Sequence, residues 1–340
     1  WSEKDPLENF EHYLKEKAVL TDEIEQQYKK EIIAEINEHL QMAFDEEKII
    51  PNLETELNDV YKSFEYQETK PSSTKKNIRF VDAISEGLQL SMDKFDDLVI
   101  MGQDIAEYGG AFKITDGFVE KFGKERVRNT PICESAIVSA AYGLSVNGVK
   151  SIVEMQFADF VSTGFNPIVN LLAKSHYRWS ENADIVVRMP CGAGVGAGPF
   201  HSPQDAKGLL ASAIEDPNPV LFFEHKGLYR SVYQEVSEGY FTTEIGKAAL
   251  LKEGKDLTII SYGAAVHWVL EVLENLSEIS VDVIDLRTLQ PLDIETIFSS
   301  AKKTGRILIV QEDSMFGGIA SDISALITEN CFEYLDAPVK

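Results

Sequence analysis

The pattern of apolar residues near the start of the chain predicts one long amphipathic helix. Asp22 followed by Glu25 is typical of a capping-box start, and Pro51 ends the pattern. Between them the apolar positions recur every four residues, at Ile24, Tyr28, Ile32, Ile36, Leu40 and Phe44. Residues 1–70 carry 8 Lys and Arg against 19 Asp and Glu and lack strand patterns. An apolar stripe on so polar a helix is more typical of a docking face than of a catalytic element.

From residue 77 onward, short apolar runs alternate with segments of helical period. The predicted strands of the first set are 97–101, 151–155, 184–189 and 220–223, and those of the second set are 257–262, 281–285 and 307–311. The helices predicted in the first set are 79–92, 134–147, 160–177 and 204–214. Such alternation is typical of mostly parallel, doubly wound sheets. We therefore expect an α/β fold with two such domains, preceded by a helical segment.

The domain boundaries follow from the same patterns. The tract from 66 to 76 is polar and contains Pro71 and paired lysines, which is typical of a linker. The expected divisions are a helical segment at 1–65, the linker at 66–76, the first α/β domain at 77–232 and the second at 243–340.

Composition and charge narrow the class of protein. The chain of 340 residues has a formal net charge of −24 and a pI near 4.6, which argues against nucleic acid as a partner because its phosphates would be repelled. No apolar run approaches the roughly 20 residues that a membrane helix needs. Cys133, Cys191 and Cys331 lack metal-ligand spacing, so they fit a reducing compartment, either the bacterial cytoplasm or the mitochondrial matrix.

One acidic residue is the main candidate for chemistry. Glu134 begins a predicted apolar helix, directly after Pro131 and Cys133, and a predicted strand and an aromatic motif follow it. An acid at a helix start is commonly only a partner of the helix dipole. A carboxyl group in apolar surroundings can instead handle a proton near neutral pH, because burial raises its pKa. The residues of this segment alone leave both interpretations open.

Six motifs along the chain share one family resemblance. They are NTPICE at 129–134, EMQFADF at 154–160, CGAGVGAGPFHS at 191–202, AKGLLASAIEDPNPVLFFEHKGLYR at 206–230, VIDLRTLQPLD at 283–293 and GGIASDIS at 317–324. Together they resemble the beta subunit of thiamine-diphosphate-dependent 2-oxo acid dehydrogenases. The string QFADF favours the branched-chain, 2-oxoisovalerate type. DPLENFEHYL at 5–14 and the helix after it resemble the C-terminal tail of the alpha subunit, as in an alpha-beta fusion.

The resemblance implies a transketolase-like pyrimidine-binding domain, a transketolase C-terminal-like domain and a role for Glu134. Thiamine diphosphate reacts after its thiazolium carbon loses a proton to its own aminopyrimidine. In the family, the glutamate of this motif is hydrogen-bonded to the pyrimidine ring, and the resemblance implies this role for Glu134, with a pKa raised by burial. Ile132, Phe160 and Gln156 are the other residues implied to bind the cofactor. Phe160 stands where relatives usually have tyrosine.

Further site residues are implied at two places. His201 matches an active-site histidine of a His-Ser motif, with a family role in acyl transfer to the lipoyl group. Asp216 and Asn218 match a loop that binds a monovalent cation such as K⁺, although turn formation alone also explains Asp-Pro-Asn-Pro. The remaining histidines are interpreted as structural: His12, His39, His176, His225 and His267.

The chain departs from the family pattern in three ways. Gln103 stands where relatives commonly have a glutamate in an acidic tunnel between active sites, and Asp104 is a partial substitute. After Ser202 the chain lacks an extra helix and strand of the family. It also has no Gly-Asp-Gly motif with a downstream asparagine, so the ligands of Mg²⁺ are expected from an alpha-type domain and none from this chain. The alternating glycines at 192–198 lack the spacing of a dinucleotide-binding loop.

The resemblance implies oxidative decarboxylation of a branched-chain 2-oxo acid on thiamine diphosphate, with acyl transfer to a lipoyl domain. The expected partners are the alpha-type domain in the same or another chain, a second copy in a dimer or heterotetramer-like assembly, and the lipoyl acyltransferase core. Pyruvate or acetoin is the alternative substrate. Two other classes stay open: a transketolase-like transferase, and a non-catalytic subunit that only organises the core.

Overall fold

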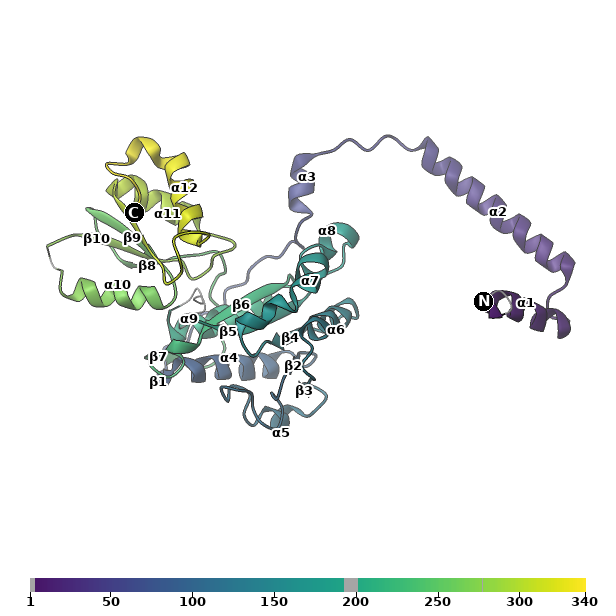
Figure 1. The fold of residues 1–340 in the computed structure, drawn as a ribbon, viewed down its shortest axis with the longest axis horizontal. Helices are drawn as coiled ribbons and strands as arrows, with labels where there is room; N and C mark the ends of the chain where they lie inside the picture. Colours follow the sequence, from purple (N-terminus) through teal and green to yellow (C-terminus); the bar gives the residue numbers. More distant parts are fainter. Residues whose placement is uncertain (1–3, 193–200, 277) are drawn as a thin grey trace. The chain divides into compact units, whose positions relative to one another are not determined.

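The computed structural model describes residues 4–192, 201–276 and 278–340, and the chain divides into two compact units (Figure 1). The first unit is Trp1–Glu56 and the second is Leu57–Lys340. Most of the glycine run at 191–202 lies outside the described residues. Within the described ranges, no helix is long and apolar enough to cross a bilayer.

The first unit consists of helices with exposed apolar faces. α1 (Pro6–Glu16) begins after Asp5, whose Oδ1 accepts a hydrogen bond of 2.8 Å from the Leu7 N–H. The predicted long helix is α2 (Asp22–Asp45). Its N-cap is Thr21 rather than Asp22, because the Thr21 Oγ1 accepts a hydrogen bond of 3.3 Å from the Ile24 N–H. None of the described residues of α1 or α2 is buried.

Lys15 joins these two helices. Its Nζ binds three carboxylates, Glu11 at 2.8 Å, Asp22 at 3.1 Å and Glu25 at 2.7 Å. Hydrogen bonds from Lys15 and then Lys29 lower the pKa of Glu25 to about 2. Exposed ion pairs of this kind add little to stability, so they mainly set the turn between the helices. The apolar stripe of α2 stays at least half exposed, at Tyr28, Ile32, Ile36, Leu40 and Phe44.

The tract after α3 (Leu53–Asn58) is anchored to the body of the second unit. The Asn218 side chain accepts a hydrogen bond of 2.8 Å from the Lys62 N–H and donates one of 2.9 Å to the Lys62 carbonyl. The Tyr66 hydroxyl lies 2.9 Å from Thr242 Oγ1, which also accepts from the Thr69 N–H at 2.9 Å. The predicted linker is therefore a fixed segment that runs into β1 (Lys75–Arg79).

Five parallel strands form the main sheet of the second unit, in the order β3-β2-β4-β5-β6. The strands are β2 (Val99–Gly102), β3 (Val127–Asn129), β4 (Ser151–Glu154), β5 (Ile185–Cys191) and β6 (Val220–His225). A separate antiparallel pair joins β1 to β7 (Tyr233–Ser237). Parallel neighbours need crossover connections, which place helices on the faces of the sheet. The predicted doubly wound parallel sheet is confirmed.

Helices pack on both faces of this sheet. On one face, α4 (Phe80–Lys94) and α9 (Pro203–Glu215) share an apolar cluster that includes Leu88 and Leu210. On the other face, α6 (Glu134–Val146) contributes Ile137 and Val138 to a second cluster. α5 (Phe118–Phe122) contacts β3. The sheet is therefore the middle of three layers, and its strand ends are open to carry a site.

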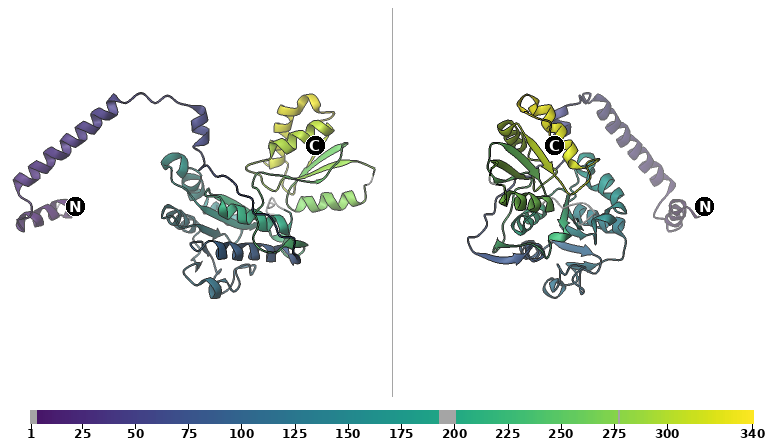
Figure 2. Two further views of the ribbon diagram at one scale, coloured as in Figure 1. Left: turned by 180° about the vertical axis from the view of Figure 1, so that it is seen from behind. Right: turned by 60° about the vertical axis from the view of Figure 1, so that its left-hand side comes forward.

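A four-stranded sheet forms the C-terminal part of the second unit, in the order β11-β9-β10-β8. Its strands are β8 (Ala249–Lys252), β9 (Leu257–Ser261), β10 (Val281–Asp285) and β11 (Ile307–Val310). β8 is antiparallel to β10, whereas the other pairs are parallel. α10 (Ala264–Glu274) packs on one face, and α11 (Ile294–Thr304) and α12 (Ile319–Cys331) pack on the other (Figure 2). The short 3-10 helix η5 (Phe332–Tyr334) follows α12, and the 3-10 helix η4 (Lys226–Leu228) follows β6 of the main sheet.

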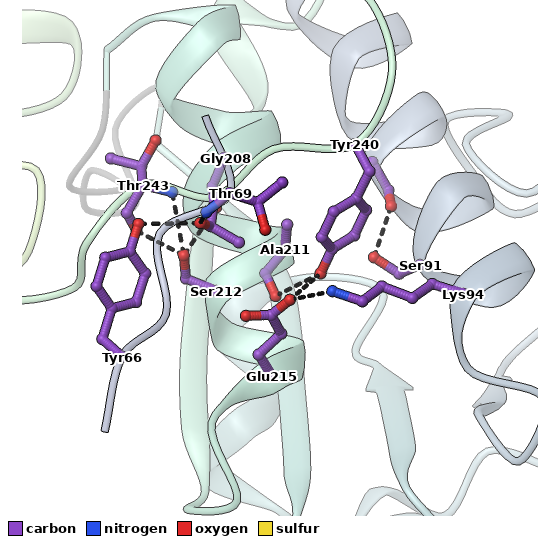
Figure 3. A network of polar contacts seen from close by, with 12 residues as sticks. Tyr66, Thr69, Ser91, Lys94, Gly208, Ala211, Ser212, Glu215, Tyr240 and Thr243 are labelled. Carbon is purple, nitrogen blue, oxygen red and sulfur yellow. Dashed lines mark hydrogen bonds and ion pairs between the residues drawn. The ribbon is translucent and has the colours of Figure 1, made fainter. Parts of the chain in front are cut away.

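Close packing holds α9 against the segment that follows β7 (Figure 3). A Cβ atom at Gly208 would lie 2.1 Å from Thr243 Oγ1, so the approach of the two segments requires glycine. The Ser212 hydroxyl lies 2.6 Å from the Thr243 carbonyl oxygen and donates to it. One turn further along α9, Glu215 accepts a hydrogen bond of 2.9 Å from the Tyr240 hydroxyl. These contacts attach the connection between the two sheets to the first of them.

The predicted helix over 160–177 is wrong. The chain there forms four short pieces, η2 (Ala158–Ser162), α7 (Phe165–Pro167), the π-turn η3 (Ile168–Leu172) and α8 (Ser175–Trp179). Gly164 and Pro167 interrupt the apolar pattern, and Pro167 has no N–H to donate to the preceding turn. The strands β1, β3, β7 and β8 lack a strand pattern in the sequence because most of their residues are exposed.

A buried ion cluster joins the middle of β5 to the carboxyl-terminal parts of β4 and β6. Arg188 of β5 has no exposed surface, and its guanidinium donates two hydrogen bonds of 2.7 Å to Glu224 of β6. It also donates to Glu154 of β4, and the Tyr229 hydroxyl donates to Glu224. Two carboxyl groups share one guanidinium. Burial, and with it the charge of Glu224, therefore raises the pKa of Glu154 even though Arg188 acts in the opposite direction.

We expect Glu154→Gln to lower the free energy of unfolding less than Glu224→Gln does, because the fold disfavours the charged form of Glu154 and an amide carries no charge. Glu224→Gln places amide hydrogens against the guanidinium and should cost about 3–5 kcal/mol. Urea unfolding of the full chain, followed by circular dichroism, measures both values.

The pH dependence separates the two carboxyl groups further. Because the pKa of Glu154 is raised in the fold, its contribution to stability is present below its unfolded pKa and is lost as the pH rises through its folded pKa. The E154Q variant should lack this decline. Equal losses of stability in E154Q and E224Q would contradict the inference that the fold disfavours the charged form of Glu154.

Candidate active site

Glu134 lies at the carboxyl edge of the main sheet, as the first residue of α6. The loop that follows a parallel strand lies at this edge, where α/β folds bind their ligands. The helix begins after Cys133, whose side chain makes no capping hydrogen bond. Glu134 is 7% exposed. The acid therefore stands where the positive end of the helix dipole meets the predicted site.

Three donors hold the Glu134 carboxylate. Its own backbone N–H is one, Thr163 Oγ1 donates to Oε2 at 3.0 Å, and Gln103 Nε2 donates to Oε1 at 3.2 Å. The backbone N–H contributes most, with Thr163 and Gln103 after it, and together they place the pKa of Glu134 below its usual range although burial acts against them. The expectation of a raised pKa is therefore wrong for this state of the chain, because donors outweigh desolvation.

Glu134 opens into a cavity of about 400 Å³. The cavity is lined by residues of the first turns of α6 and by Thr163: Cys133, Glu134, Ser135, Ala136, Ser139 and Thr163. Small side chains on this wall leave room for a planar ring next to the carboxyl group. Burial raises the pKa of Cys191 to about 12, whereas Cys133 is partly exposed in the cavity wall.

The apolar residues predicted for the cofactor lie around this position, on the surface. Ile132 is 80% exposed and Phe160 is 40% exposed, and neither lines the cavity. Gln156 is half-buried, just beyond the end of β4. Large exposed apolar side chains beside a buried acid indicate a surface that another molecule covers. Glu134 offers a partner for a ring nitrogen, and Ile132 and Phe160 offer apolar surface, so the chemistry of these side chains is compatible with the aminopyrimidine part of thiamine diphosphate.

His201 is buried and contacts a carboxyl group. It is 8% exposed, and its Nδ1 lies 2.7 Å from Asp285 Oδ2 at the end of β10. The His201 carbonyl oxygen lies 2.9 Å from His267 Nε2, and burial lowers the pKa of His267. His201 is not among the residues that line the cavity at Glu134. The described contacts therefore do not bring His201 and Glu134 together.

One group of side chains in the described ranges has metal-ligand spacing, and it contains His201, Asp205 and Asp285. Its oxygen atoms already have partners. Arg287 binds Asp205 at 2.8 Å, Ser202 donates to Asp205 at 2.6 Å, and Asp285 binds His201. With a guanidinium already in place, this group is an ion-pair cluster between the two sheets and a poor cation site.

Asp216 and Asn218, predicted as cation ligands, form a turn. Asp216 Oδ1 accepts hydrogen bonds of 2.8 Å from the backbone N–H and from the side-chain amide of Asn218. The Asn218 side chain also binds the backbone of Lys62. Turn formation thus accounts for the contacts that both side chains make, and the cation site stays a prediction.

Sequence patterns do not predict that two residues, Gln103 and Thr163, contact Glu134. Gln103 is visible as a departure from the family pattern, but nothing near it indicates contact with Glu134. Thr163 has no signal at all, because it lies 29 positions beyond Glu134 in the segment interpreted as a helix. A regular helix over 160–177 would not bring the Thr163 hydroxyl to that carboxylate. The contact of Thr163 depends on the turn after η2, and that of Gln103 depends on where β2 ends.

The sequence matches three family models. The model of the transketolase pyrimidine binding domain matches residues 76–205, that of the transketolase C-terminal domain matches 246–340, and that of the dehydrogenase E1 component matches 1–52. Together with the two α/β domains and the acid at the sheet edge, these matches define an enzyme of the thiamine-diphosphate-dependent, transketolase-like class.

The relatives narrow this class. The 2-oxoisovalerate dehydrogenase subunit beta of Bacillus subtilis is 42% identical over 287 residues, covering 77% of this chain and 87% of that protein. The mitochondrial 2-oxoisovalerate dehydrogenase subunit beta of Dictyostelium discoideum is 40% identical and covers 80% of each chain. The pyruvate dehydrogenase E1 component subunit beta of Bacillus subtilis is 39% identical, covering 76% of this chain and 87% of that one. The chain belongs to the family of beta subunits of 2-oxo acid dehydrogenase E1 components, which are decarboxylating enzymes dependent on thiamine diphosphate.

A solved structure agrees on the fold. A split-gene transketolase described as an inactive beta4 tetramer has a TM-score of 0.61 and 23% sequence identity, and the match covers 74% of this chain and 85% of that one. Because branched-chain and pyruvate relatives are both similar to this chain, the comparisons assign its substrate to the 2-oxo acids in general.

Proposed function

We propose that this chain supplies the beta-type half of a component that decarboxylates a branched-chain 2-oxo acid and passes the acyl group to a lipoyl domain. The observation that carries the proposal is Glu134, a carboxyl group held by three donors at the wall of a cavity at the sheet edge. A structural acid at a helix start would need no cavity and no partners from two other segments.

The branched-chain substrate is supported by two observations. The string QFADF favours this type, and the 2-oxoisovalerate relatives are 42% and 40% identical to the chain. A pyruvate relative at 39% supports the second candidate substrate, pyruvate. Because these relatives differ little in their sequence identity to the chain, the substrate must be determined by comparing 2-oxoisovalerate with pyruvate directly.

Four residues of the chain have separate roles at the cofactor. Thiamine diphosphate, when bound, supplies the carbon nucleophile that the reaction needs. Glu134 exchanges a proton with the pyrimidine ring of the cofactor. Ile132 and Phe160 supply apolar contacts to that ring, and Gln156 supplies a polar one. Phe160 has no hydroxyl group to donate, so its contribution is contact area alone.

The exposed apolar surfaces of this chain indicate the kind of partner that it needs. The stripe on α2 and the apolar residues near Glu134 are exposed, and an alpha-type domain, in the same polypeptide or another, is the proposed cover for both. That domain would also supply Mg²⁺ and its ligands for the diphosphate. A second copy of the chain and a lipoyl acyltransferase core complete the assembly. Three free cysteines suit a reducing compartment, either cytoplasm or mitochondrial matrix.

His201 is proposed to act in acyl transfer. Asp285 binds its Nδ1, which leaves Nε2 as the nitrogen that can act on a lipoyl group. Asp216 is the proposed ligand of a monovalent cation such as K⁺, with Asn218 already engaged with Lys62. Both roles rest on motif resemblance and are open to direct tests.

Replacing Glu134 with Gln should lower the rate of lipoyl reductive acylation by about 10²–10⁴-fold, because the amide keeps the shape but loses the transferable proton. The assay combines the full chain, the alpha-type domain, Mg²⁺, thiamine diphosphate and a lipoyl domain. Hydrogen exchange at the thiazolium carbon, followed by NMR, isolates the step at which Glu134 acts.

Glu125→Gln is the matched control, since this acid is exposed and lies one strand before Glu134. Wild-type exchange in E134Q would remove Glu134 from the mechanism. The same assay compares 2-oxoisovalerate with pyruvate. A higher kcat/KM for pyruvate would overturn the branched-chain assignment and leave the role of Glu134 intact.

His201→Ala should reduce lipoyl reductive acylation more than decarboxylation measured with an artificial electron acceptor, because only the first reaction uses acyl transfer. The two rates, measured on one preparation, should separate. Equal losses of rate in both assays would indicate that His201 binds the cofactor or the substrate instead. Full activity in both would assign His201 to the ion-pair cluster with Asp285 alone.

The isolated chain should bind thiamine diphosphate and Mg²⁺ poorly, because a chain of net charge −24 repels the diphosphate and its own site offers only the pyrimidine contacts. Addition of the alpha-type domain should restore tight binding. Titration calorimetry with and without that domain measures the difference. Micromolar affinity of the chain alone would mean that the diphosphate site lies within it.

A further inference from the structure

Two side chains from distant parts of the sequence donate to Glu134, and neither gains or loses a proton near neutral pH. Gln103 directly follows β2, and its Nε2 lies 3.2 Å from Glu134 Oε1. Thr163 directly follows η2, and its Oγ1 lies 3.0 Å from Glu134 Oε2. Gln103 is buried, and the next residue, Asp104, turns the chain with a φ of 55°. The Gln103 amide is therefore a fixed donor.

The Thr163 hydroxyl has a second acceptor within reach. Its Oγ1 lies 2.7 Å from the Phe160 carbonyl oxygen as well as 3.0 Å from Glu134. A hydroxyl group has one hydrogen, so it donates to one of these oxygens at a time, and its lone pairs can accept only from Glu134 when that carboxyl group is protonated. When the hydroxyl turns toward Phe160, Glu134 Oε2 loses a donor and faces an acceptor. One rotation thus changes which protonation state of Glu134 its surroundings favour.

We propose that Thr163 and Gln103 are positioning residues that set the charge of Glu134, with Thr163 as a two-position donor and Gln103 as a fixed one. With Thr163 turned to Glu134, the carboxylate ion is favoured. With Thr163 turned to Phe160, the protonated carboxyl group is favoured, and its O–H can be donated to a ring nitrogen that accepts. The second step rests on the proposed function, whereas the first concerns this chain alone.

Neutral groups dominate the surroundings of Glu134. Its own backbone N–H, Thr163 and Gln103 lower its pKa, and no charged side chain in the described ranges contributes to this shift. The titratable groups on the surrounding segments are Cys133 in the cavity wall, Asp104 beside Gln103, and Asp159 of η2. Removal of a neutral donor is therefore the direct way to change the protonation of Glu134.

The test is an NMR titration of the full chain labelled with ¹³C at the glutamate carboxyl groups. The signal of Glu134 is the one that is lost in E134Q. Thr163→Val removes the hydroxyl at almost constant size, and Gln103→Leu removes the amide donor. Both should raise the titration midpoint of Glu134, because each deletes a hydrogen bond to the charged form. Thr163→Ser keeps the hydroxyl and should retain the wild-type midpoint. Circular dichroism checks that each variant folds.

Unchanged midpoints in both T163V and Q103L would overturn the proposal. So would a rise in T163S as large as that in T163V, since the size of the side chain and not its hydroxyl would then be responsible. Binding of thiamine diphosphate and Mg²⁺ by the chain with its alpha-type domain is the second readout. If the midpoints shift as expected but this cofactor never binds, the proposed function fails while the donor role of Thr163 and Gln103 stands.

Discussion

The carboxyl edge of the main sheet depends on one buried guanidinium. Arg188 of β5 joins Glu154 of β4 to Glu224 of β6, so three adjacent strands are fixed relative to one another. A buried charge is stable only with good partners, and those partners are available only in this register of the strands. The chain leaves β4 at this point and passes through Gln156 to Thr163. The position of the site therefore follows from an ion cluster that takes no part in its chemistry.

Three neutral hydrogen-bond donors, one of them at the start of α6, lower the pKa of Glu134. Its carboxylate is almost fully covered, and burial alone would raise its pKa, yet its own N–H, Thr163 and Gln103 lower it. Hydrogen bonds to the charged form outweigh desolvation here. A carboxylate in this state must gain a proton before it can donate to a neutral ring, and in our proposal rotation of the Thr163 hydroxyl favours the protonated form without movement of the backbone.

Many large apolar side chains of this protein are exposed. The stripe of α2 and the side chains of Ile132 and Phe160 are open to solvent, and so are other large apolar side chains such as Met315 and Phe316, whereas the sheets enclose compact apolar clusters. Such surfaces are typical of positions that a partner covers. The proposed completion of the site by an alpha-type domain would account for an acid and exposed apolar side chains in a chain without a metal-binding motif.

The sequence by itself determined the α/β class, the long helix at 22–45 and most of the buried strands, because apolar periodicity is a property of neighbouring residues, and its motifs made Glu134 a candidate. It failed at 160–177, where Gly164 and Pro167 break the helix, and at the exposed edge strands, which have no apolar pattern. Only the tertiary structure decided the partners of Glu134 and of His201. Those contacts join residues 29 and 84 positions apart, and whether such groups meet depends on the packing of whole elements, which no local pattern records.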